Sequence, residues 1–183
     1  AETAGVPHGP ALVNRVFEVV TGQKAFATLL LDGLSVLLQA LVGTLLLCKE
    51  AAAAMQQNTP NAAGERGALV MTASVAAFDG QIGQAAYSSS KGGVVGMTLP
   101  VARDLSAVGV RVNCIAPGLI DTPIYGEGPE SEAFKAKLGE SVLFPKRLGV
   151  PDELASMVEE LITNSYMNAE VIRVDGGIRM PPK

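Results

Sequence analysis

Short apolar runs along the chain alternate with longer stretches of helical periodicity. Three runs have the length and composition of buried strands: Ala68–Thr72, Val110–Ile115 and Val171–Val174. Between the first two, helical spacing extends from near Ala85 to about Val108. Because a strand, a long helix and a second strand form a crossover unit, these strands are expected to run parallel. The pattern therefore predicts an α/β fold built on a parallel sheet.

Upstream of these elements, residues 25–57 are strongly apolar on every face of a helix. A membrane-associated protein using residues 25–48 as a span is one reading. Asp32 lies inside that run, and inserting an aspartate at the centre of a membrane helix costs about 2.5–3.5 kcal/mol of free energy. Three further residues weaken a span: Gly33, Gln39 and Gly43. We favour one or two helices packed on the sheet, with part of their surface in a subunit interface.

The second half of the chain adds smaller elements. Pro100 is expected to interrupt the long helix, and Gly109 to end it. The polar segment 126–143, with a short helix at 131–138, is expected to form a mobile lid. A last helix opens at Pro151 with acidic residues in its first turn. Its expected core stripe is Leu154, Met157, Val158, Leu161 and Ile162.

Composition narrows the class of protein. The 183 residues suffice for one domain, and their net charge of −4 argues against a nucleic-acid surface. Cys48 and Cys114 lie in apolar contexts typical of reduced, buried thiols. The sole histidine, His8, fits a solvated loop, and no metal-ligand spacing occurs. The first residues lack the pattern of a secretory signal, so we expect a cytoplasmic or mitochondrial-matrix protein.

Candidate chemistry lies where the first strand meets the long helix. Tyr87 and Lys91 are four residues apart and share one helix face, and Ser74 can reach that face if the intervening loop folds back. A neighbouring ammonium and a helix N-terminus favour a phenolate, which can remove a hydroxyl proton as hydride leaves the carbon. No side chain accepts a hydride, so this chemistry implies a nicotinamide cofactor. A tyrosine and a lysine at this spacing also occur on many helices without a catalytic role.

Three motifs favour a catalytic role for these residues. Ser74 precedes Tyr-Ser-Ser-Ser-Lys at 87–91, Arg-Val-Asn-Cys-Ile-Ala-Pro-Gly follows at 111–118, and Val-Ile-Arg-Val-Asp-Gly-Gly at 171–177. Together they resemble the short-chain dehydrogenase/reductase family. The residues within and around these motifs, including Phe-Pro-Lys-Arg-Leu-Gly, are similar to those of the family's type 2 3-hydroxyacyl-CoA dehydrogenases. The resemblance extends from about residue 40 to the C-terminus.

The resemblance implies a single, partial Rossmann-like domain over residues 1–183, in three layers with helices on both faces of a parallel sheet. It implies an NAD-dependent oxidoreductase that interconverts 3-hydroxyacyl-CoA and 3-ketoacyl-CoA. It assigns catalysis to Ser74, Tyr87 and Lys91. It assigns cofactor binding to Tyr87, Lys91, Pro117, Gly118, Ile120 and Thr122. Independently of the resemblance, the apolar surface exceeds what one small sheet can cover, so we expect a homodimer or homotetramer assembled through helices at 40–57 and 86–108. No membrane or nucleic-acid partner is expected.

The chain departs from the family pattern at its N-terminal side. The glycine-rich loop that receives the pyrophosphate, and the first strands around it, do not occur in these residues. Ala4-Gly5 resembles the end of the family's fourth strand, and Ala40 replaces a helix asparagine of the family. If these residues act alone, we expect weak or no NAD binding and an open groove beside the fourth strand. The rival reading is a non-catalytic dehydrogenase remnant that serves as an oligomerisation or interaction module.

Overall fold

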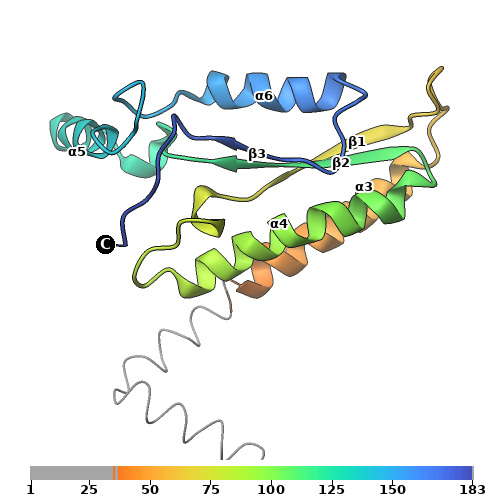
Figure 1. The fold of residues 1–183 in the computed structure, drawn as a ribbon, viewed down its shortest axis with the longest axis horizontal. Helices are drawn as coiled ribbons and strands as arrows, with labels where there is room; N and C mark the ends of the chain where they lie inside the picture. The colour runs from red at the N-terminus through yellow and green to blue at the C-terminus, as the bar shows by residue number, and fades with distance from the viewer. Residues whose placement is uncertain (1–34, 36, 183) are drawn as a thin grey trace, which may run out of the picture.

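The computed structural model describes residue 35 and residues 37–182, which build a three-stranded parallel sheet (Figure 1). The strands lie in the order β1-β2-β3, and both neighbouring pairs run parallel. Cys114 of the central strand faces Met71 on one side and Val171 on the other. The strand bounds are Gly67–Thr72 for β1, Val110–Pro117 for β2 and Val171–Val174 for β3. The predicted parallel sheet is confirmed, and β2 extends two residues beyond the predicted strand.

Helices cover both faces of this sheet. In Figure 1, α3 and α4 lie below the sheet, α6 lies above it, and α5 lies beyond the carboxyl ends of the strands. The helix bounds are Gly43–Met55 for α3, Ala85–Ser106 for α4, Pro129–Gly139 for α5 and Pro151–Thr163 for α6. A π-helical turn spans Leu38–Val42, and 3₁₀ turns span Val75–Ala77 and Pro123–Tyr125. The three-layer arrangement agrees with the prediction.

The long helix α4 is not interrupted at Pro100, so that prediction is wrong. Proline removes one helical hydrogen bond and crowds the preceding turn, at a cost of about 3 kcal/mol. Here Val94, Thr98 and Ala102 are buried on both sides of the proline, and the Thr98 hydroxyl donates to the Val94 carbonyl. Burial of these flanks against the sheet offsets the cost, and the helix continues.

The expected core stripe of α6 is wrong at its last position. Leu161 is fully buried, whereas Ile162 is 49% exposed. Successive helix residues point about 100° apart, so a helix that directs Leu161 at the sheet turns its neighbour toward solvent.

The main core lies between β1, β2 and the helices α3 and α4. Its buried members are Cys48, Met71, Ala73, Val94, Ala102, Val112, Cys114 and Ala116. The two cysteines are unpaired and buried, as expected, and burial raises the pKa of both thiols. Their position suits small apolar side chains of the core.

Several predictions concern residues that the structure does not describe. His8, the strand remnant at Ala4-Gly5, and residues 25–34 and 36 of the apolar stretch 25–48 lie outside the described residues. Within the described residues, none of the helices combines the length and apolarity needed to cross a bilayer. Ala40 falls within the π-helical turn that leads into α3.

We expect Gly109→Ala to destabilise the fold by more than about 1 kcal/mol. Gly109 has a φ of +74°, and a Cβ there would collide with the carbonyl oxygen of Gly64. The Gly109 carbonyl also accepts the Arg66 N–H at 2.7 Å, so the backbone cannot easily move away. Urea unfolding of the two proteins measures the difference.

The control is Gly96→Ala, because Gly96 lies in the exposed middle of α4 and a Cβ there meets nothing within 4 Å. That substitution is expected to be neutral or stabilising, since alanine favours helix over glycine. Equal stability of Gly109→Ala and the wild type would contradict the assigned backbone role.

Candidate active site

Lys91 connects the start of α4 to the end of β1. Its Nζ donates to the main-chain carbonyl of Thr72 at 3.0 Å and lies 5.9 Å from the centroid of the Tyr87 ring. Tyr87 is the third residue of α4, and its side chain is 39% exposed. One ammonium group therefore lies beside a solvent-accessible phenol and at the carboxyl end of a parallel strand.

Ser74 lies at the same end of the sheet, two residues beyond β1. The adjacent Ala73 still pairs with β2, because its N–H donates to the Ile115 carbonyl at 2.8 Å. The Ser74 Oγ accepts the Ala76 N–H at 3.1 Å, which leaves its own proton for another acceptor. The structure thus brings Lys91 to Tyr87 and to the strand end that precedes Ser74. Direct contact of Ser74 and Tyr87 with one substrate oxygen remains a prediction.

The segment after β2 carries the predicted cofactor-binding residues. The Gly118 N–H donates to the Val174 carbonyl at 3.0 Å, which fixes Pro117-Gly118 against β3. A Cβ on Gly118 would lie 2.7 Å from the Cβ of Asp175. The packing of this loop against β3 therefore requires a glycine at position 118.

The backbone of Ile120 is paired on one side only. It forms a parallel bridge with Gly149, whose N–H donates to the Leu119 carbonyl and whose carbonyl accepts the Asp121 N–H. In such a bridge the N–H and C=O of Ile120 itself point to the opposite side. Within residues 37–182 neither group has a hydrogen-bond partner, nor does the Thr122 hydroxyl.

These free groups fit one end of a nicotinamide cofactor. A carboxamide has an amide donor and a carbonyl acceptor, which match the free C=O and N–H of Ile120. Thr122 adds a hydroxyl two residues later. The residues predicted for the nicotinamide end therefore have suitable chemistry.

Tyr125 is a neighbour of the site that the sequence analysis missed. Burial raises the pKa of the Tyr125 phenol, and Coulombic interactions with the neighbouring Asp121 and Tyr87 side chains raise it further. Its ring lies 6.3 Å from that of Phe134 on α5. Tyr125 therefore stands between the predicted cofactor loop and the predicted lid. No spacing or motif distinguishes it in the sequence.

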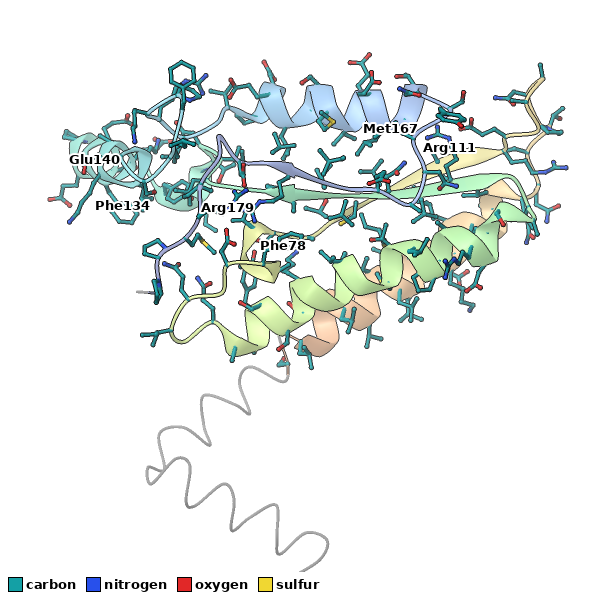
Figure 2. The ribbon with its side chains drawn as sticks, viewed as in Figure 1. Phe78, Arg111, Phe134, Glu140, Met167 and Arg179 are labelled. Atoms are coloured by element: carbon teal, nitrogen blue, oxygen red, sulfur yellow. The ribbon has the colours of Figure 1, made fainter. Side chains whose placement is uncertain are left out.

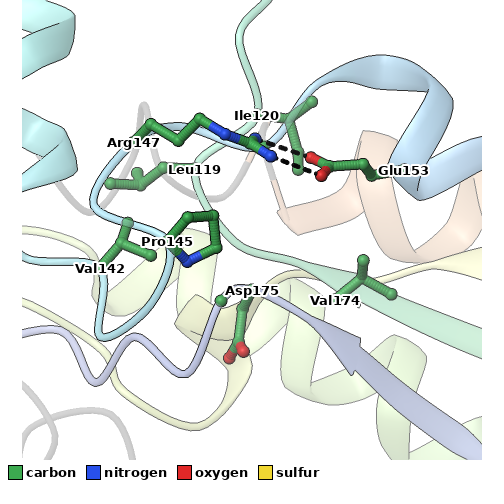
Figure 3. A pocket seen from close by; sticks show the side chains of 10 residues that line it. Leu119, Ile120, Val142, Pro145, Arg147, Glu153, Val174 and Asp175 are labelled. Carbon is green, nitrogen blue, oxygen red and sulfur yellow. Dashed lines mark hydrogen bonds and ion pairs between the residues drawn. The ribbon is translucent and has the colours of Figure 1, made fainter.

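A cavity of about 210 Å³ lies beside the segment that follows β2, and Ile120 and Gly149 are among the residues that line it (Figure 3). Its walls are mostly apolar, from Leu119, Val142 and Pro145 among others. Ser74, Tyr87 and Lys91 do not line this cavity, so it is separate from the candidate catalytic residues.

An ion pair on the rim of this cavity fixes the start of α6. Arg147 donates to both carboxylate oxygens of Glu153, at 2.9 and 2.7 Å, and Glu153 also accepts the Val150 N–H at 2.8 Å (Figure 3). The hydrogen bonds from Arg147 and from the Val150 N–H lower the pKa of Glu153 to about 2. The carboxylate thus joins the loop 145–150 to the N-terminus of the helix.

We expect Glu153→Gln to lower the thermal midpoint at neutral pH. The pKa of Glu153 falls from 4.5 to about 2 on folding, so the ionised carboxylate stabilises the folded protein fully when the pH is above 4.5. This contribution is lost as the pH falls from 4.5 through about 2. The difference between wild type and variant should therefore shrink over that range. Scanning calorimetry across acidic pH measures it.

Glu159→Gln on the same helix is the control, because Glu159 is exposed and its carboxylate makes no side-chain bond among the described residues. A Glu153→Gln deficit that stayed constant down to pH 2 would contradict the assignment.

The comparisons with known proteins agree with this arrangement. A family model described as enoyl-(acyl carrier protein) reductase matches residues 18–179, which is most of the chain. The chain belongs to the short-chain dehydrogenase/reductase family. The resemblance inferred from its motifs is therefore confirmed.

Individual relatives within this family are similar over nearly all of the chain. It is 48% identical over 174 residues to 3-hydroxyacyl-CoA dehydrogenase type-2 of Bos taurus and of Homo sapiens. These matches cover 95% of this chain and 65% of each relative. The chain thus spans less than two thirds of the length of these short-chain dehydrogenase/reductase relatives.

A solved structure supports the fold assignment. The crystal structure of 3-hydroxyacyl-CoA dehydrogenase type-2 from Mycobacterium avium aligns with a TM-score of 0.77 and 47% sequence identity. The alignment covers 82% of this chain and 57% of that chain. The predicted Rossmann-like α/β fold of the family is confirmed for the portion that the structure describes.

Proposed function

We propose that this chain carries the proton-transfer half of an NAD-dependent oxidoreductase that interconverts a 3-hydroxyacyl thioester and its 3-ketoacyl thioester. The observation that supports the proposal is that Lys91 contacts two parts of the candidate site at once. Its ammonium lies beside the Tyr87 ring and is held at the end of β1 by the Thr72 carbonyl. The names of the similar proteins support the substrate class.

In the oxidation direction, Tyr87 accepts the proton of the substrate hydroxyl, while the Ser74 hydroxyl donates a hydrogen bond to the same oxygen. The Lys91 ammonium lies beside the phenol ring, 5.9 Å from its centroid. A bound NAD would supply the acceptor for the hydride that leaves the carbon bearing the hydroxyl. Ile120 and Thr122 orient the nicotinamide end through their free polar groups, as the match to a carboxamide suggests.

A direct assay tests this proposal. The chain is incubated with NAD and a short 3-hydroxyacyl-CoA, and reduced nicotinamide is followed by its absorbance, with the 3-ketoacyl product identified by mass spectrometry. Because these residues alone are expected to bind NAD weakly, product is expected at high NAD concentration, and it should depend on both NAD and enzyme. Its absence at saturating NAD would contradict the proposed reaction.

The rival function, a non-catalytic interaction module, has its own supporting observation. Residues 1–183 contain no glycine-rich pyrophosphate loop of their own. If these residues act alone, the contacts at the nicotinamide end must offset the loss of freedom of a flexible dinucleotide without such a loop. Calorimetry with NAD separates the two: no measurable binding favours the module, and binding in the micromolar range favours the enzyme.

We also propose that two or four copies of the chain associate through α3 and α4. Four leucines on these helices are exposed in the single chain: Leu45, Leu46, Leu47 and Leu99. Apolar surface gathered on adjacent helices is typical of a protein–protein interface.

Light scattering of the wild type is expected to give a dimer or tetramer at micromolar concentration. Leu46→Asp should shift it toward monomer, because the substitution places a charge in the apolar contact. Ile162→Asp, on the exposed side of α6, serves as the control for a general effect of an added charge. A wild-type monomer would contradict the interface.

A further inference from the structure

A cluster of charged side chains around Arg173 joins three separate parts of the chain. From the last residues of β3, the Arg173 guanidinium donates to Asp175 at 2.7 Å and to both carboxylate oxygens of Asp79, at 2.7 and 3.4 Å. It also donates to the Ile178 carbonyl at 2.8 Å and stacks on the Phe78 ring, 5.2 Å from its centroid. One side chain therefore binds the sheet, the loop after β1 and the C-terminal segment.

Asp79 lies in the loop that connects Ser74 with Tyr87 (residues 75–86). The same loop has further bonds to the C-terminal segment, defined here as residues 178–182. The Gln81 side chain donates to the Pro181 carbonyl at 3.0 Å, and the Ile82 N–H donates to the Pro182 carbonyl at 2.8 Å. The loop thus has two attachments, one through Arg173 and one through the end of the chain.

The ion pair is well placed to hold its position. The Arg173 and Asp79 side chains are only 20% and 15% exposed, so solvent screens their attraction weakly. The hydrogen bond from Arg173 lowers the pKa of Asp79, which keeps the carboxylate ionised at neutral pH. Asp175, paired with both Arg173 and Arg179, balances the second positive charge. Two arginines and two carboxylates form a neutral unit, in which Arg173, Asp79 and Asp175 are mostly buried and Arg179 is exposed.

We propose that Arg173 is a positioning residue for the reaction at Tyr87. Through Asp79 it holds the 75–86 loop against β3 and the C-terminal segment, and the loop in turn sets where Tyr87 stands relative to Ser74. Both candidate catalytic residues flank this loop, so a shift of the loop moves one hydroxyl relative to the other. A displacement of about 1 Å between reacting groups costs up to about 100-fold in rate. The inference rests on the proposed function.

Two variants and one control test it in the full chain. Asp79→Asn keeps the shape of the side chain but removes its charge, and Arg173→Lys keeps the charge but not the two parallel hydrogen bonds. Arg179→Gln is the control, because Arg179 pairs with Asp175 yet makes no hydrogen bond to Asp79 in the described residues. The measurements are kcat and KM for a 3-hydroxyacyl-CoA, the thermal midpoint, and amide hydrogen exchange in the loop.

We expect Asp79→Asn to reduce kcat by about tenfold or more, with a smaller change in KM, and Arg173→Lys to retain an intermediate rate. Amide exchange at Ile82 should become faster in both variants, while exchange in β2 stays at the wild-type rate. Arg179→Gln should keep the wild-type kcat. A purely structural role would instead lower the thermal midpoint and the fraction of active enzyme, without this local pattern.

Two results would overturn the inference alone. One is a wild-type kcat in Asp79→Asn despite faster exchange at Ile82, and the other is unchanged exchange in both variants. A wild-type chain without turnover would overturn the proposed function, and the positioning role with it. The two failures are distinguishable, because only the second removes activity from the unmodified chain.

Discussion

Tyr87→Phe is expected to reduce kcat by about 10²–10⁴-fold, the usual contribution of a positioned acid–base group. The substitution removes one hydroxyl from a side chain that is 39% exposed at the start of α4, so little packing is lost. Lys91 keeps its hydrogen bond to the Thr72 carbonyl, since that bond does not involve the phenol. The rate of NAD reduction, together with a thermal melt, separates loss of chemistry from loss of fold.

Tyr166→Phe is the matched control, because Tyr166 is 98% exposed and lies in the loop between α6 and β3. It removes the same hydroxyl from a residue outside the candidate site, and its kcat should equal that of the wild type. Turnover of Tyr87→Phe within a few-fold of the wild type would refute the role assigned to this tyrosine.

The strands and their parallel pairing could be predicted because their signals are local. An apolar run of four to eight residues, followed by a helical stretch and another such run, has few other folded arrangements. All three predicted strands exist, and their bounds differ by at most two residues. The pairing of β2 with both neighbours then follows from the topology of crossover units.

The errors come from tertiary packing that a local pattern does not contain. Pro100 has the sequence signal of a helix break, but buried residues on both sides hold α4 together. Ile162 continues the apolar stripe of α6, but the orientation of the helix is fixed by Leu161. In both cases burial against the sheet decides between alternatives that differ by a few kcal/mol.

Some contacts of the candidate site could also be predicted from the sequence, and others could not. The proximity of Tyr87 and Lys91 could be predicted from their spacing on one helix. The contact of Lys91 with Thr72, and that of Arg173 with Asp79, join residues 19 and 94 positions apart, so no spacing rule indicates them. The free polar groups of Ile120 depend on its bridge with Gly149, which is likewise set only by the folded chain.

Arg111→Met is expected to destabilise the fold by about 3–5 kcal/mol, the usual cost of breaking a buried ion pair. Arg111 lies at the end of the sheet away from the candidate site, as Figure 2 shows, and only 7% of it is exposed. Its guanidinium donates to three carbonyls, those of Leu161, Ile162 and Met167, at 2.6–2.8 Å. It also donates to the Glu65 carboxylate at 2.8 Å. Methionine fills similar volume but leaves a part-buried charge and three acceptors without their donor.

Urea unfolding gives the free energy of each variant. Arg103→Met is the control, since Arg103 is exposed on α4, and surface substitutions usually stay within about 0.5 kcal/mol. Should Arg111→Met not fold, Glu65→Gln gives a milder test, because it removes the charge partner and leaves the three carbonyl bonds in place. Its expected loss is smaller, about 1–3 kcal/mol, as for a hydrogen bond to a charged group. Wild-type stability in either variant would mean that the guanidinium does not join the end of α6 to β2.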